Sequence, residues 1–296
     1  MKEFFQRLFG QNNVLSTEIP TRPIPPEEYH LGQEKSYQEP LQLVVGCAQS
    51  TGRQREHNED ALFTLSTTLS SEQNNLPFGL YLVADGMGGH QYGEVASEIA
   101  IRNMASHVIE KLYIPLFNSS PSSPDESLQE IMQMGVLGAH QAITKQVPGG
   151  GTTLTAALIL GDQLTIAHVG DSRAYHIGNN GTIDPLTRDH SLVSRLVELG
   201  QITTDEAAVH PQRNVLYRAL GQGEPFDPDI KTTPLPDSGY LFLCSDGLWG
   251  VVPDDQIHRT IMQACSPEDA CQKLVEAANL AGGPDNITAI LVRLPS

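Results

Sequence analysis

The sequence has little positive charge. It contains 18 lysines and arginines against 35 aspartates and glutamates, and its formal net charge is −17. Nucleic acids and anionic membranes bind proteins through basic patches, because these patches release counterions. The charge balance therefore predicts a protein that does not bind nucleic acid. Part of the negative charge would be neutralised if several carboxylates held divalent ions.

Cysteine and long apolar runs are scarce as well. No closely spaced CxxC pair occurs among Cys47, Cys244, Cys265 and Cys271. We expect these to be small buried side chains in a reducing compartment rather than a disulfide framework or a zinc site. The sequence also lacks an apolar run of signal-peptide or membrane-spanning length. We therefore expect no transmembrane segment and a cytoplasmic location.

Two phosphate-handling motifs are missing. Gly149–Thr153 is a glycine run beside threonines, but it lacks the lysine and the following helix of a GxxxxGK[ST] loop. A nucleotide-binding P-loop is therefore excluded. The sequence offers no CxxxxxR phosphatase loop either, so we do not expect a covalent nucleophile.

The first 40 residues differ from the rest of the chain. They are polar and punctuated by prolines, and Phe4, Phe5, Leu8 and Phe9 could form the apolar face of one short helix. Such a short helix is marginal alone in water. We expect residues 1–40 to form a disordered, Pro-rich tail; a docking peptide or a membrane-surface contact is the alternative.

Residues 41–296 are expected to form a single domain. Apolar periodicity predicts strands and helices in alternating groups. The predicted strands cover residues 41–48, 61–67, 78–85, 154–160, 164–169, 173–177, 240–245 and 286–294, and the long helices cover residues 95–112, 128–147, 253–264 and 266–281. Antiparallel strands with helices in separate pairs are typical of an α+β fold, here a central antiparallel β-sandwich flanked by helix pairs in α-β-β-α layers.

Two segments of this domain have a distinct local character. Turn residues at Gly161-Asp162 and Gly178–Gly181 predict that the strands between residues 154 and 177 pair as an antiparallel meander. Residues 187–226 are polar and helix-prone, with few large apolar residues. This composition predicts a mobile flap inserted between strands.

Three of the predicted strands end in an aspartate beside a glycine. The runs Leu80–Asp85, Leu164–Asp171 and Leu241–Asp246 all stop in this way. One such aspartate means little, because Asp-Gly is a common turn pair. However, Asn58–Asp60 and Gly282–Asn286 add acids beside two further strands. Oxygen ligands in this number, without a Cys or His cluster, favour Mg²⁺ or Mn²⁺ over zinc.

These acidic segments resemble the ordered motifs of a known family, the metal-dependent protein phosphatases of serine/threonine type 2C in their bacterial form. The resemblance covers residues from about 41 to 294. It is carried by Arg55-x-x-Asn58-Glu59-Asp60, Val83-Ala84-Asp85-Gly86-Met87-Gly88-Gly89-His90, Gly151-Thr152-Thr153, Val169-Gly170-Asp171-Ser172-Arg173, Ser245-Asp246-Gly247 and Gly283-Pro284-Asp285-Asn286.

The resemblance implies a centre of two Mn²⁺ or Mg²⁺ ions at one end of the sandwich, with a third, weaker ion beside the flap. Asp85 matches the ligand that bridges the two ions, and Asp171 matches a ligand of the third. Glu59 and the Gly86 carbonyl would bind one ion of the pair. The implied metal ligands are thus Glu59, Asp85, Gly86, Asp171, Asp246 and Asp285.

Three more residues receive roles from the resemblance. Arg55 is similar to the phosphate-binding arginine of the family, with Arg53 as the alternative. An arginine suits this role because its guanidinium group can donate to two phosphate oxygens. Asp60 is similar to the acid that orients the attacking water, and Asn286 matches a partner of the metal ligands. Eukaryotic members carry a histidine where this chain has Met87, as bacterial members often do. The general acid is thus open between His90, read otherwise as a structural histidine, and metal-bound water.

The implied activity is hydrolysis of phosphoserine and phosphothreonine by direct attack of a metal-bridging water. The expected partners are phosphorylated proteins and a Ser/Thr kinase that acts on them, and we expect a monomer. The alternatives are a catalytically silent phosphoprotein-binding module, a small-phosphoester hydrolase and a two-metal nuclease. The acidic net charge of −17 counts against the nuclease.

Overall fold

The computed structural model describes residues 42–70, 75–88, 91–117, 126–223 and 226–295. The predicted tail of residues 1–40 and the candidate acid His90 lie outside these residues, so both predictions remain predictions. None of the described helices is long and apolar enough to cross a membrane.

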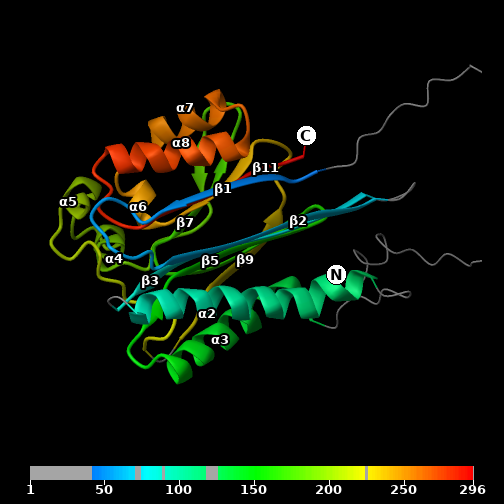
Figure 1. Ribbon diagram of the computed structural model, residues 1–296, viewed down its shortest axis with the longest axis horizontal. Coiled ribbons are helices and arrows are strands. Elements are labelled where there is room, and N and C mark those ends of the chain that lie inside the picture. The colour runs from blue at the N-terminus through cyan, green and yellow to red at the C-terminus, as the bar shows by residue number, and fades with distance from the viewer. Residues whose placement is uncertain (1–41, 71–74, 89–90, 118–125, 224–225, 296) are drawn as a thin grey trace, which may run out of the picture.

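The described chain is arranged in four layers (Figure 1). One sheet has the strand order β1-β11-β10-β7-β8, and the other has the order β2-β3-β5-β6-β9 with the short β4 paired to β3. The strands of the first sheet are β1 (Val44–Ser50), β11 (Ile287–Arg293), β10 (Tyr240–Cys244), β7 (Arg173–Ile177) and β8 (Ile183–Pro185). Those of the second are β2 (Asp60–Ser70), β3 (Asn75–Met87), β4 (Gly151–Thr152), β5 (Leu154–Leu160), β6 (Gln163–Val169) and β9 (Asp229–Pro234).

Helix pairs form the two outer layers. α2 and α3 cover the second sheet, and α7 and α8 cover the first (Figure 1). The helices are α2 (Gln91–Val108), continued by η2 (Ile109–Tyr113) and η3 (Ile114–Phe117), α3 (Leu128–Gln146), α4 (Leu192–Glu198), α5 (Thr204–Ala208), α6 (Asp246–Trp249), α7 (Asp254–Gln263) and α8 (Pro267–Leu280). Every strand pair is antiparallel. The predicted α-β-β-α architecture is confirmed.

The predicted meander is wrong at its third strand. β5 and β6 pair as expected, with Leu160 opposite Gln163, and β7 pairs with β8 across the Gly178–Gly181 turn. However, β6 and β7 lie in different sheets. Gly170 has a φ of 106°, which glycine adopts at little cost, and the chain crosses here from one sheet to the other. A short link with a glycine looks the same in sequence whether it closes a hairpin or changes sheet.

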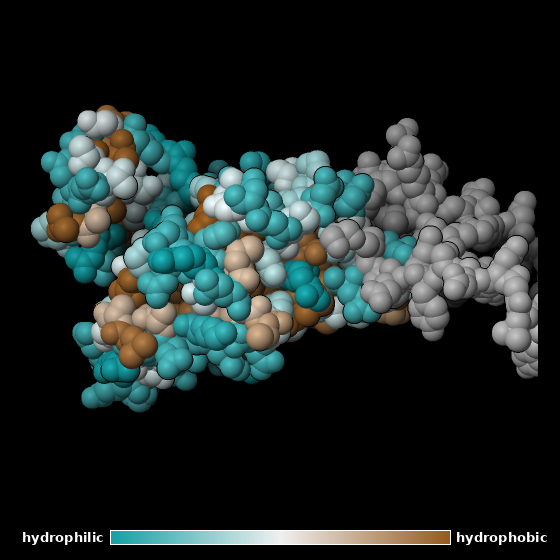
Figure 2. All heavy atoms as spheres, turned by 90° about the horizontal axis from the view of Figure 1, so that it is seen from above, coloured by the Kyte–Doolittle hydropathy of each residue, from teal (hydrophilic) through white to brown (hydrophobic). Residues whose placement is uncertain are grey.

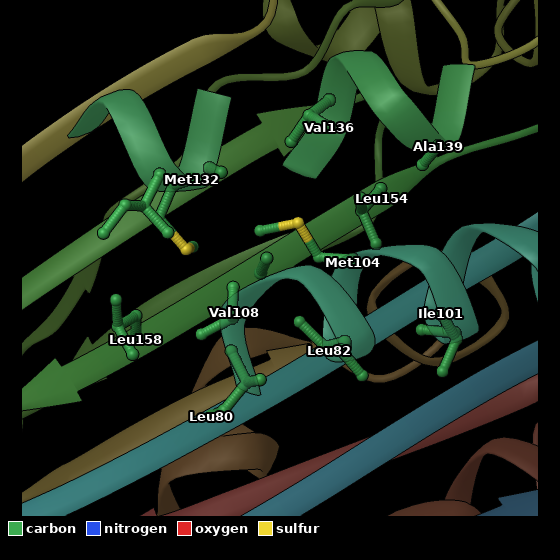
Figure 3. Close-up of a cluster of buried hydrophobic side chains, with 14 of the residues drawn as sticks. Leu80, Leu82, Ile101, Met104, Val108, Met132, Val136, Ala139, Leu154 and Leu158 are labelled. Atoms are coloured by element: carbon green, nitrogen blue, oxygen red, sulfur yellow. The ribbon is translucent and has the colours of Figure 1, made fainter. Parts of the chain in front are cut away.

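The long apolar run of β3 is explained by burial on both faces. Leu80, Leu82 and Ala84 pack against the α2–α3 layer, where Met104 and Met132 also lie (Figure 3). The alternate residues Tyr81 and Val83 pack in the layer between the two sheets. A strand that is covered on both sides needs apolar residues at every position rather than at every second one.

The outer surface contrasts with these layers. The face seen from above is mainly hydrophilic, with hydrophobic residues in small separate patches (Figure 2). Cys244 and Cys271 are buried and free, but the prediction of buried cysteines is wrong for Cys47 and Cys265, which are exposed. Cys47 lies on β1, which is an edge strand with one neighbour, and Cys265 lies in the link between α7 and α8.

Candidate metal centre

Two aspartates of the second sheet face each other directly. In the β2–β3 ladder, Asp60 lies opposite Asp85. The alternation along these strands places both side chains on the face of Leu62 and Val83, which pack between the sheets. Like charges directly opposite each other destabilise a sheet. This pair therefore needs either a shared proton or a bound cation.

The first sheet brings two more acids to the same end. Asp246 begins α6 directly after β10, and Asp285 lies just before β11. β10 and β11 are adjacent antiparallel strands, with Cys244 opposite Ala289. Asp246 is close enough to Asp85 for its charge to raise the pKa of Asp85. Acids of both sheets thus meet where the sandwich ends.

Burial and mutual repulsion raise the pKa values of these acids. Burial raises the pKa of Asp85 well above its usual range, and the charges of neighbouring acids add to this effect. These neighbours are Asp60, Asp246, Asp171 and Asp285. The pKa values of Asp60 and Asp246 are raised for the same two reasons. The acids therefore carry an electrostatic cost that a cation would relieve.

The acids border a pocket with a volume of about 220 Å³. All of the predicted site residues except Asp60 line this pocket. Five further lining residues were not predicted to bind metal or to take part in catalysis. The lining residues are Arg55, Glu59, Asp85, Gly86, Met87, Gly88, Thr153, Asp171, Asn214, Leu216, Asp246, Asp285 and Asn286. Asp60 is 7% exposed and lies beside Asp85 in the sheet. The structure therefore brings the predicted residues together.

Asn286 fixes the loop that carries Glu59. Its Oδ1 accepts a hydrogen bond from the Glu59 backbone N–H at 2.8 Å, and its Nδ2 donates to the carbonyls of Thr51 at 2.8 Å and His57 at 2.9 Å. The Asn286 backbone N–H donates to Asp285 Oδ1 at 2.9 Å. The Asn286 side chain thus orients the segment before β2. Asn286 itself follows Asp285 in the sequence, so it connects this segment to the acids of the first sheet.

Close backbone contacts explain two glycines of the site. A Cβ on Gly86 would lie 2.3 Å from the carbonyl oxygen of Gly93, and one on Gly93 would lie 1.9 Å from Glu59 Oε2. The Gly86 N–H also donates to the Glu59 carbonyl at 3.1 Å. The start of α2 is therefore packed against the end of β3, which leaves no space for a side chain at Gly86, whereas a side chain at Gly93 would displace the Glu59 carboxylate.

Arg55 lines the pocket and is ion-paired there. Its Nη2 forms an ion pair with Asp285 Oδ2 at 2.7 Å, and its side chain is 49% exposed. An arginine at the mouth of the pocket remains accessible to a ligand oxygen. The same contact occupies one oxygen of a predicted metal ligand.

Asp171 lines the pocket just after the end of β6. It is 7% exposed, and burial and Asp246 raise its pKa well above the usual range. Trp249 Nε1 donates to the Asp171 carbonyl at 3.0 Å. The Trp249 ring in turn lies under the Arg173 guanidinium, 3.5 Å from the ring centroid. Asp171 is thus held by the short α6 helix as well as by its own turn.

The predicted flap supplies two residues that line the pocket, Asn214 and Leu216. Leu216 forms an antiparallel bridge with Ser191, and the His190 carbonyl accepts from the Tyr217 N–H at 2.9 Å. The sequence assigned no role to Asn214 or Leu216, because a short polar loop carries no periodic signal. A β-branched and aromatic stretch around Val215 and Tyr217 was the one available indication of extended backbone.

The donor chemistry of the pocket fits a hard divalent cation. Oδ1 of Asp60 and Oδ1 of Asp246 are buried without a hydrogen-bond partner, which is costly for a carboxylate. The atoms nearby that could coordinate a metal are carboxylate and carbonyl oxygens, which Mg²⁺ and Mn²⁺ prefer as ligands. Among the described residues, no three His, Cys, Asp or Glu side chains are already grouped to hold a metal.

The fold and the pocket define a class of protein: a four-layer α-β-β-α sandwich with an acidic, candidate metal-binding centre between its sheets. The family model described as protein phosphatase 2C matches residues 45–287. The chain therefore belongs to the protein phosphatase 2C family.

Similar proteins support this assignment. A serine/threonine phosphatase stp from Listeria welshimeri is 37% identical over 241 residues, which are 81% of this chain and 92% of that protein. The crystal structure of the Mycobacterium tuberculosis serine/threonine phosphatase PstP/Ppp has a TM-score of 0.71 at 32% identity, and covers 86% of this chain and 100% of that chain. A structure of the PstP catalytic domain in complex with two manganese ions has a TM-score of 0.69 at 30% identity, with 86% and 100% coverage.

Proposed function

We propose that this protein is a metal-dependent serine/threonine protein phosphatase that hydrolyses phosphoserine and phosphothreonine in proteins. The observation that carries the proposal is the meeting of Asp85, Asp246 and Asp285 at one pocket, with Asp60 directly opposite Asp85 in the sheet. Membership of the protein phosphatase 2C family supports the reaction. The expected cofactor is Mn²⁺ or Mg²⁺, and a structure similar to this one contains two manganese ions.

The pocket acids would hold the ions according to their positions in the family motifs. Asp85 would contact both ions, Glu59 and the Gly86 carbonyl would bind one, and Asp246 and Asp285 would bind the other. Asp171 would bind a third, weaker ion. When bound, a pair of divalent ions supplies an activated water and neutralises charge at phosphorus.

The remaining residues have tasks that follow from their contacts. Asp60 Oδ1 is buried and has no partner, so it can accept a proton or a hydrogen bond from the attacking group. Arg55 can leave Asp285 and offer two N–H donors to phosphate oxygens. Met87 lines the pocket but cannot donate a proton, so the proton for the leaving alkoxide comes from another group. Asn286 keeps Glu59 in place.

The test is hydrolysis of a phosphothreonine peptide and of p-nitrophenyl phosphate with Mn²⁺, Mg²⁺ or EDTA. We expect turnover that EDTA abolishes and that Asp246→Asn removes. Asp255→Asn is the matched control, because Asp255 is an acid of α7 with a 72% exposed side chain. Phosphopeptide binding without turnover would replace the proposal with the silent binding module. Turnover of p-nitrophenyl phosphate alone would replace it with the small-phosphoester hydrolase.

The proposal extends to the location, oligomeric state and substrates of the protein. We expect the protein to act as a cytoplasmic monomer on proteins that a Ser/Thr kinase has phosphorylated. Its relatives include a serine/threonine phosphatase stp, whose name supports the choice of phosphorylated residues. Size-exclusion chromatography with light scattering tests the monomer, and comparison of phosphoproteins in cells with and without the protein tests the substrates.

A further inference from the structure

Two buried hydroxyl groups connect Asp60 to the opposite sheet. Asp60 belongs to β2 in one sheet, whereas Ser245 follows β10 and Thr288 lies on β11 in the other. Ser245 and Thr288 are both 0% exposed. Strand alternation places Thr288 on the side of Ile290 and Val292, which pack between the sheets. Polar side chains thus replace the apolar layer where it reaches the pocket.

The hydrogen-bond donors in this cluster can be assigned from chemistry. The Thr288 backbone N–H donates to Ser245 Oγ at 3.0 Å, and Gln49 Nε2 donates to Thr288 Oγ1 at 3.0 Å. Because these nitrogens can only donate, each hydroxyl oxygen acts as acceptor there and has its own proton free. Ser245 Oγ then donates to Asp60 Oδ2 at 2.7 Å, and Thr288 Oγ1 donates to the same oxygen at 2.6 Å.

The two oxygens of Asp60 therefore differ. Oδ2 accepts two short hydrogen bonds, of the strong kind made to a charged acceptor. Oδ1 is buried and has no partner. The same contacts tie β2, which carries Asp60 opposite Asp85, to the two strands that flank Asp246 and Asp285.

We propose that Ser245 and Thr288 are positioning residues for the reaction. They hold Asp60 Oδ2 across the gap between the sheets, so that Oδ1 alone is left to act on the attacking group. Gln49 supports the arrangement by fixing the direction of the Thr288 hydroxyl. The inference rests on the proposed function for its catalytic consequence, although the hydrogen-bonded cluster itself does not.

The first experiment compares Thr288→Val and Thr288→Ser under steady-state conditions with Mn²⁺ and a phosphothreonine peptide. Valine has the shape of threonine without the hydroxyl, and serine keeps the hydroxyl. A lost hydrogen bond to a charged group corresponds to about 10-fold to 100-fold. We expect Thr288→Val to lower kcat by about this factor with KM and Mn²⁺ affinity within about 2-fold, and Thr288→Ser to recover most of the loss. Equal kcat in Thr288→Val and wild type would overturn the inference.

The second experiment is a double-mutant cycle that uses Asp60→Ala as the background. If the hydroxyl acts through Asp60, Thr288→Val lowers kcat much less in Asp60→Ala than in wild type. The free energies of unfolding of the same four proteins are measured with urea in EDTA, where no turnover is needed. A second cycle, with Ser245→Ala in place of Thr288→Val, tests the other hydroxyl independently. Additive effects in both measurements would overturn the inference.

These measurements separate the two proposals. A wild-type protein without metal-dependent turnover, but with coupling between Thr288 and Asp60 in unfolding, would overturn the proposed function and leave the hydrogen-bonded cluster intact. An active wild type with additive cycles would overturn the positioning role alone.

Discussion

The pocket is built from two regions that are held in the fold in very different ways. At the acidic end, Asp85, Asp246 and Asp285 lie on or beside strands that are paired on both sides in the sheets, and Asp60 lies on the edge strand β2, directly opposite Asp85. The flap segment, residues 187–223, contributes Asn214 and Leu216 to the same pocket. The acids thus share the rigidity of the sandwich, and the flap does not.

The flap segment is held mainly through its two ends. His190 is 2% exposed, and Leu220 is 0% exposed. Gly170 N–H donates to His190 Nδ1 at 3.1 Å, and Leu220 pairs with Thr152. Between these ends, Val209 is 79% exposed and Leu199 is 55% exposed.

This difference assigns the reacting groups to the acidic end and the control of substrate access to the flap segment. Reacting groups need positions fixed within a fraction of an ångström, and strand ends provide them. A segment with few buried contacts opens at low cost, which suits residues that meet variable substrates. The following predictions test whether the two regions really behave differently.

The largest effect is expected from Asp85→Asn. We expect kcat/KM to fall by more than the roughly 10- to 100-fold that changes in outer partners of a metal cause. The variant should nevertheless be more stable than wild type in EDTA, because it removes one of several buried, mutually repelling carboxylates. Steady-state kinetics with Mn²⁺ and urea unfolding in EDTA measure the two effects. A variant that is less stable than wild type in EDTA would contradict the electrostatic cost assigned to the acidic end.

The second prediction concerns pH and His168, whose Nε2 lies 3.0 Å from the Arg188 carbonyl oxygen at the start of the flap segment. Burial, reinforced by the charge of His190, lowers the pKa of His168 to about 3, whereas an unfolded histidine titrates near 6.5. Its contribution to stability is therefore complete above about pH 6.5 and is lost as the pH falls toward 3. At pH 5.5 the loss should be about 1.4 kcal/mol, since the unfolded state gains a proton that the folded state does not.

The measurement is urea unfolding in EDTA at pH 7.5 and 5.5 for wild type and His168→Gln. The difference in unfolding free energy between the two should shrink as the pH falls. His176→Gln is the control, because the His176 side chain is 20% exposed and lies 3.7 Å from Asp184. A constant difference for His168→Gln would show that the buried histidine is not neutral in the folded protein.

Much of the acidic end could be predicted from the sequence, for a physical reason. An apolar run that stops at Asp-Gly reveals both the strand and the place where its last side chain emerges, as for Asp85 and Asp246. The relation between sheets could not be predicted in this way. Thr288 looks like any β-branched strand residue. Its contact with Asp60 joins β2 and β11, which are far apart in the sequence and lie in different sheets.

The flap and the edge strands β8 and β9 were harder to predict. β9 has the sequence Asp-Ile-Lys-Thr-Thr-Pro and no buried residue, so no apolar alternation marked it. β8 has three residues, too few for any period. Arg55 was recognised as a candidate, but its ion pair with Asp285 joins positions 230 residues apart, and no local pattern encodes such a contact.

The smallest effect is expected from Arg195→Ala. Arg195 Nη1 lies 3.1 Å from Glu198 Oε2, and its side chain is 55% exposed. Exposed ion pairs of this kind contribute about 0.3–0.5 kcal/mol, so the free energy of unfolding should fall by no more than that. Limited proteolysis within residues 199–213 should nevertheless become faster, because local opening of the flap segment costs less than global unfolding. Lys273→Ala, which breaks an exposed pair on α8, is the control and should leave that cleavage rate unchanged. A loss above about 1 kcal/mol for Arg195→Ala, beyond the usual range for exposed pairs, would show that the flap unfolds together with the sandwich, and the contrast between the two regions would fail.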